Sequence, residues 1–136
     1  MSVPADVEIL VRNRAEDRCQ YCRMHQSLQG ATFHIEHVIP VSAGGASDES
    51  NLVLACPSCN LHKSSRTQAV DPESGESVRL FHPLLDSWSE HFEFRQSRLA
   101  GLTAIGRGTV QALKLNHPRR LKIREAESMF GLFPPD

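Results

Sequence analysis

Two Cys-x-x-Cys pairs constrain the fold of this chain more than any other feature. They are Cys19 and Cys22 in "CQYC" and Cys56 and Cys59 in "CPSC", and they account for all 4 cysteines of the 136 residues. A tight turn brings sulfurs three positions apart to one point, so two such turns can place four thiolates around one tetrahedral zinc ion. Disulfides are disfavoured in a reducing compartment, and a redox site needs only one pair. The pattern therefore predicts a structural zinc that fixes both ends of the intervening segment 23–55.

The composition is that of a globular protein. The apolar fraction is 40% and the charged fraction 23%, which does not indicate disorder. No run approaches the roughly 18 apolar residues of a membrane span, and the N-terminus lacks the basic start and apolar stretch of a signal peptide. We therefore expect a cytoplasmic protein without a membrane partner.

The charge is distributed unevenly along the chain. The net charge is −1, yet segment 95–124 has eight basic residues and no acidic one. Such a segment can bind phosphates even in a near-neutral protein, because phosphate binding depends on the local electrostatic potential rather than on the net charge. A solvated face of two ordinary helices is the alternative, and the charge pattern alone does not separate the two.

The order of elements predicts an α+β fold. We expect a core in residues 1–70, with the structural zinc, and a C-terminal extension in residues 71–136. Apolar spacing, strand composition and turn residues predict a first helix, two strands joined by a long loop, a second helix, two short strands and two final helices. The first helix is expected over 4–17, the two strands over 32–39 and 51–56, and the second helix over 57–70. The short strands are expected over 78–81 and 90–94, and the two final helices after Thr103. Thr103 is expected to cap the first of the final helices, and Asn116 to end it and cap the second.

Two histidines and a glutamate stand at the end of the first expected strand, in "FHIEHVIPVSAGG". A polar strand edge before a turn is one interpretation, and a metal ligand beside a proton acceptor is the other. The combination "CQYC … HIEHVIPVSAGG … NLVLACPSCNLHK" resembles the HNH endonucleases, the zinc-containing branch of the ββα-metal (His-Me finger) nucleases, over about residues 12–68. The segments "LFHP", "WSEHF" and "GLTAIGRGTVQALKLN" resemble the extension that follows this domain in many small bacterial HNH proteins.

The resemblance implies a role for each residue of the motif. His37 would be the general base, and Glu36 and Asn60 would bind one divalent cation, Mg²⁺ or Mn²⁺. Asn51 would hold the loop that presents His37, and Lys63 could contact a phosphate. The last letter of the family name is an asparagine here, and Glu36 stands where aspartate is commoner. Because neighbours in a flat strand point to opposite faces, the pleat is expected to break at 36–38.

The implied activity is hydrolysis of phosphodiester bonds in DNA, by nicking or double-strand cleavage, with RNA a less expected substrate. The basic residues expected to hold the nucleic acid are Lys63, Arg66, Arg107, Arg119, Arg120 and Lys122. His34 shares a strand face with Glu36 and is expected to be a polar neighbour of the site. Trp88 and the nearby phenylalanines are expected to pack the core of the extension.

The alternative function is a zinc-containing module that binds nucleic acid or another partner without cleaving. Sequence specificity and the choice between monomer and homodimer stay open at this point.

Overall fold

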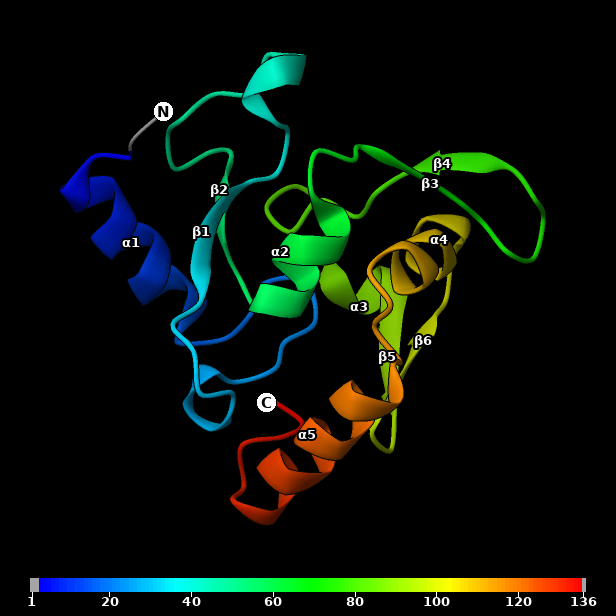
Figure 1. Ribbon diagram of the computed structural model, residues 1–136. Helices are drawn as coiled ribbons and strands as arrows, with labels where there is room; N and C mark the ends of the chain where they lie inside the picture. Colours follow the sequence, from blue (N-terminus) through cyan, green and yellow to red (C-terminus); the bar gives the residue numbers. More distant parts are fainter. Residues whose placement is uncertain (1–2, 136) are drawn as a thin grey trace.

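The computed structural model describes residues 3–135, and its elements alternate between short helices and two-stranded sheets (Figure 1). In chain order these are α1 (Ala5–Ala15), the 3₁₀ turn η1 (Gln26–Leu28), β1 (His34–His37), the 3₁₀ turn η2 (Val41–Ala43), β2 (Leu52–Ala55), α2 (Pro57–Lys63), β3 (Gln68–Val70), β4 (Ser77–Arg79), α3 (Trp88–His91), β5 (Phe92–Arg95), β6 (Arg98–Gly101), α4 (Ala104–Ala112) and α5 (Pro118–Met129). Sequence neighbours β1–β2, β3–β4 and β5–β6 each pair antiparallel. The predicted α+β class is confirmed.

The β1–β2 hairpin and α2 form the centre of the first half. His34 pairs with Ala55 and His37 with Leu52, so the ladder runs in register to the end of β1. Pro57 occupies the first turn of α2, where its missing N–H is harmless, and the Cys56 sulfur accepts from the Cys59 amide. The strand, long loop, strand and helix predicted for this half are therefore present.

One hydrophobic core joins both halves of the chain. Buried side chains of the hairpin and the cysteine turns pack in the same cluster as side chains of the extension. Trp88 lies 5.2 Å from Phe92 and 4.8 Å from Phe94, ring centre to ring centre, and Phe81 meets Phe92 edge to face. The expected aromatic core of the extension is confirmed, and it is continuous with the core of the first half.

Two local predictions are wrong. The helix expected over 57–70 ends at Lys63, because Ser64 adopts a positive φ of 50° and the polar run after it supplies no apolar face. Residues 68–70 instead pair with β4. The Asn116 side chain bonds both backbone groups of Leu99, so His117 rather than Asn116 caps α5. Thr103 does cap α4, by accepting from the Gly106 amide.

The expected break in the pleat at 36–38 is also wrong. His37 keeps its ladder position opposite Leu52, and the Val38 amide still donates to the Asn51 carbonyl at 2.9 Å. The chain leaves the ladder only after Val38. Across residues 3–135, none of the helices has the length and apolar character that a membrane crossing requires.

Candidate active site and cysteine cluster

A groove of about 540 Å³ lies between the end of β1 and the outer side of α2. We call it the β1–α2 groove. Its polar lining includes Glu36 and His37 of β1 and Asn60 of α2, and Leu61 forms part of its wall. Within residues 3–135 the Asn60 side-chain amide makes no hydrogen bond. The structure therefore brings together three of the residues that the motif singled out.

Glu36 is a buried carboxylate with an unused oxygen. The residue is 8% exposed, and its Oε2 atom is buried without a hydrogen-bond partner. Oε1 lies 3.8 Å from the Lys63 ammonium. Burial raises the pKa of Glu36 to about 7, although Lys63 acts in the opposite direction. A carboxylate in this state is one that a cation would stabilise.

Lys63 lies inside the protein rather than on its surface. The residue is 1% exposed, and its ammonium donates to the carbonyls of His37 at 3.2 Å and Ser64 at 3.4 Å. Burial lowers its pKa, and Glu36 opposes that effect. The prediction that Lys63 contacts a phosphate is therefore wrong: the side chain ties the C-terminal end of α2 to the end of β1.

The His37 ring is held by the long loop. Its Nε2 atom lies 2.9 Å from the Ser47 hydroxyl oxygen. Asn51 fixes the same loop, because its side chain accepts from the Ile39 amide and donates to the Ile39 and Ala46 carbonyls. Ser47 was not singled out by the sequence, since a serine in a polar loop carries no distinctive signal.

Asn51→Ala should destabilise the fold by about 2–3 kcal/mol, because it removes the three hydrogen bonds that the buried Asn51 side chain makes to the Ile39 amide and to the Ile39 and Ala46 carbonyls. The expected result is a lower urea midpoint with an unchanged slope. Asn13→Ala, on the exposed face of α1, is the matched control. A loss below about 0.5 kcal/mol would contradict this role for Asn51.

The four cysteines converge at one buried point. All their sulfurs lie within 4.8 Å of one another, Cys22 and Cys56 are 3.9 Å apart, and all four thiols are free. Sulfurs around a tetrahedral zinc with bonds of about 2.3 Å lie about 3.8 Å apart. The predicted convergence is confirmed, and the cluster is compatible with a structural zinc.

Two arginines of α5 lie beside this cluster. Arg120 donates to the Cys59 sulfur at 3.1 Å and to the Cys56 sulfur at 3.5 Å, and it also reaches the Leu113 carbonyl. Burial alone would lower the pKa of Arg120, but the neighbouring thiols, Cys59 first, raise it above its usual value. Arg124 is fully buried and donates to the Ser97 and Leu115 carbonyls. The prediction that Arg120 holds nucleic acid is wrong, because its charge faces the thiols.

The other predicted basic residues divide into two kinds. Arg107 makes two hydrogen bonds of 2.9 Å to the buried Asp71 carboxylate and also pairs with Glu73, so it anchors the β3–β4 turn. This pairing leaves it no free charge for a phosphate. The exposed side chains are Arg66, Arg119, Lys122 and His34.

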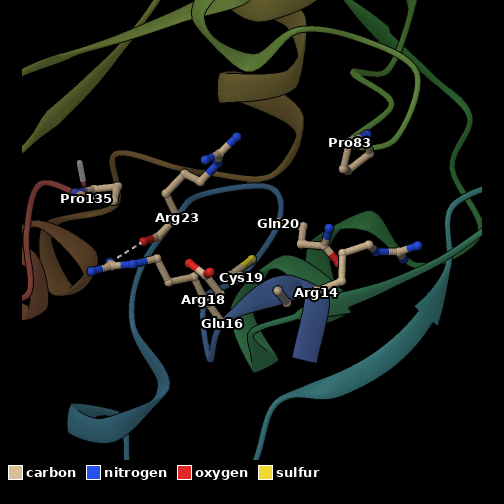
Figure 2. Close-up of a pocket in the computed structure, with 9 residues that line it drawn as sticks. Arg14, Glu16, Arg18, Cys19, Gln20, Arg23, Pro83 and Pro135 are labelled. Carbon is tan, nitrogen blue, oxygen red and sulfur yellow. Dashed lines mark hydrogen bonds between the residues drawn. The ribbon is translucent and has the colours of Figure 1, made fainter. Parts of the chain in front are cut away.

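A second hollow, of about 350 Å³, lies beside the first cysteine turn and is lined by three arginines (Figure 2). The three side chains diverge from one another, and each has a partner within the protein. Arg14 donates to the Glu49 and Leu52 carbonyls, and Arg18 donates to the Arg23 and Leu132 carbonyls. Arg23 stacks over Trp88, 5.2 Å from the ring centre. These arginines bind the α1 end of the chain to the hairpin and the extension.

A β-hairpin followed by a short helix, with the polar groups of strand and helix in one groove, defines the ββα-metal class of nuclease folds. Comparison with known families agrees, because the model of the HNH endonuclease family matches residues 19–66. Residues 19–66 of this chain are therefore an HNH endonuclease domain.

Two curated relatives extend the similarity beyond that domain. Septu protein PtuB of Bacillus mycoides (strain KBAB4) is 30% identical over 118 residues, which cover 67% of this chain and 39% of that protein. Septu protein PtuB of Bacillus thuringiensis is 23% identical over 117 residues, which cover 85% of this chain and 43% of that protein. The chain thus spans about two fifths of the length of these relatives.

Proposed function

We propose that this protein is a metal-dependent endonuclease that hydrolyses phosphodiester bonds in DNA. The observation that carries the proposal is the buried, unpartnered Oε2 atom of Glu36 in a groove that it shares with His37 and Asn60. A buried carboxylate without a partner is costly, and hard oxygen donors fit Mg²⁺ or Mn²⁺. Glu36 and Asn60 would hold one such cation.

The cation, when bound, would supply positive charge to stabilise the pentacoordinate phosphate and the departing sugar oxygen. His37 would accept the proton of the attacking water. We assign its Nε2–H as the donor to Ser47, which leaves the lone pair on Nδ1 for that proton. Asn51 would keep the ring in position through the loop, without touching the substrate.

We propose that the four cysteines hold zinc, as a structural ion. A four-thiolate site is closed and has no open coordination position, so it would stabilise the fold and take no part in hydrolysis. Arg120 would offset part of the negative charge of the thiolates.

Purified protein incubated with supercoiled plasmid tests the proposed function most directly. We expect conversion to nicked circles when Mg²⁺ or Mn²⁺ is added, and none when EDTA is added in excess. Binding of the plasmid without nicking in either metal would contradict the proposal and favour a non-cleaving module.

Cation binding should depend on pH through Glu36. The cation needs the ionised carboxylate, and a pKa near 7 leaves Glu36 mostly protonated in slightly acidic solution. We expect the Mn²⁺ affinity to be about tenfold lower at about pH 6 than at about pH 8, and to level off as the pH rises above the pKa. Titration of Mn²⁺ followed by electron paramagnetic resonance measures this.

Glu36→Gln is the control for that titration, because it removes the ionising group and keeps the size of the side chain. It should bind Mn²⁺ weakly at both pH values. An equal pH dependence in the parental protein and in this variant would assign the titration to another group.

A further inference from the structure

Three hollows follow one another from the proposed active site to the C-terminal helices. Leu61, which is 73% exposed, lines the β1–α2 groove and also a groove of about 320 Å³ between α2 and α5. His117 lines this α2–α5 groove and a third hollow of about 370 Å³ beside α4. Figure 1 agrees, because the connection between α4 and α5 passes beside α2. Neighbouring hollows therefore share a lining residue, and we call the three together the path.

The cations along this path differ from most other basic side chains of the molecule. Within the part of the chain that the structure describes, four exposed basic side chains at or near the path make no ion pair and no side-chain hydrogen bond. They are Arg66, Arg98, Lys114 and Arg119. By contrast, Arg79 pairs with Asp86 at 2.6 Å and Arg107 with Asp71 at 2.9 Å. Unpaired exposed charge is what a polyanion can bind without displacing an internal partner.

The histidines of the path lie in the same positive environment. His62 and His117 line the α2–α5 groove together with Arg119 and Arg120. The His117 Nδ1 atom accepts from the Arg119 amide, so the neutral ring keeps its Nε2–H as a donor. The path therefore offers positive charge together with the His117 Nε2–H donor.

We propose that duplex DNA leaves the β1–α2 groove over Leu61 and continues along this path, with its phosphates on His62, Lys114, His117 and Arg119. The proposal rests on the proposed endonuclease function and extends it, because it assigns a binding surface to the C-terminal extension. DNA fits better than an acidic protein, since the path is continuous with the groove in which a scissile phosphate would lie. Contacts of this kind position the DNA without reading its sequence.

The test removes two charges from the path and, separately, two charges from elsewhere. The path variant is Lys114→Gln with Arg119→Gln, and the control is Arg95→Gln with Lys122→Gln. Both control positions are exposed and line none of the three hollows, so the proposal places Lys122 off the DNA, contrary to the expectation from the sequence. Fluorescence anisotropy with a labelled duplex of about 30 base pairs, between about 50 and 200 mM salt and without divalent cations, gives the affinity and its salt slope. Plasmid nicking at saturating protein is measured in parallel.

The path variant should bind about tenfold more weakly than the parental protein, and the slope of its affinity against salt should fall by about 2 on logarithmic axes. The control variant should stay within about twofold of the parental affinity. Nicking at saturating protein should be unchanged in the control variant, because it changes neither the groove nor the path.

Equal affinity and equal slope for the two variants would overturn the path, and retained nicking would then leave the proposed function standing. If the path variant loses affinity and salt slope as expected but the parental protein does not nick the plasmid, the result would support the path and contradict the proposed function. Poly-L-glutamate that displaces the duplex as well as unlabelled DNA does would overturn the choice of DNA and identify the surface as one for acidic polypeptides.

Discussion

His37→Ala should reduce Mg²⁺-dependent plasmid nicking by about a thousandfold. In the proposed mechanism the His37 imidazole of the β1–α2 groove accepts the proton of the attacking water, and an alanine removes that acceptor. The ring is half-buried and its hydrogen bond is to one loop hydroxyl, so its loss should leave the fold intact. Single-turnover rates on supercoiled plasmid measure the effect.

His34→Ala is the matched control. It removes an imidazole from the same strand, but His34 is exposed and does not line the groove. The nicking rate of this control should stay within about twofold of the parental rate. Zinc content and melting temperature should be unchanged in both variants. Nicking by His37→Ala at the parental rate would show that His37 is not the base.

Cys59→Ser should leave the chain largely unfolded. The four sulfurs lie at the centre of the shared core, and structural zinc in small domains contributes about 10–16 kcal/mol of apparent binding free energy. A domain of this size has a stability of only about 5–15 kcal/mol, so losing the ion removes most or all of it. Circular dichroism and the molar ratio of zinc to protein measure the outcome.

Ser58→Ala controls for a substitution in the same turn, because Ser58 precedes Cys59 and contributes no sulfur. It should keep a full zinc complement and a parental melting curve. A folded Cys59→Ser protein with the parental melting temperature would mean that the cluster does not stabilise this fold through a metal.

The local pattern of the sequence accounts for the first half of the fold. The spacing of the cysteines predicts their convergence, and "HIEH" followed by a proline and a glycine pair predicts the strand and the long loop. Gly45 shows why the loop needs glycine, since an added Cβ would lie 1.8 Å from the Ile39 carbonyl oxygen. The cysteine turns, the strand and the loop depend on residues that are close together in the sequence, so the sequence alone predicts them.

The sequence could not predict which charged side chains become buried. Lysine and arginine usually lie at the surface, yet tertiary packing places Lys63 against Glu36 and Arg120 against the cysteines. The short strand at 68–70 was missed for a similar reason, because its pairing with 77–79 depends on a turn rather than on its own residues. Whether a charged side chain is buried depends on contacts with residues far away in the sequence, and a local sequence pattern does not predict such contacts.

The hydrogen bonds from Arg120 to the Cys56 and Cys59 sulfurs have a consequence for protein engineering. A chimera joined after residue 70 would separate the two cysteine turns from the Arg120 guanidinium, which lies 61 residues beyond Cys59 in the sequence. A stable graft of residues 1–70 should therefore carry the terminal helix α5 as well, or receive an equivalent cation from the recipient scaffold.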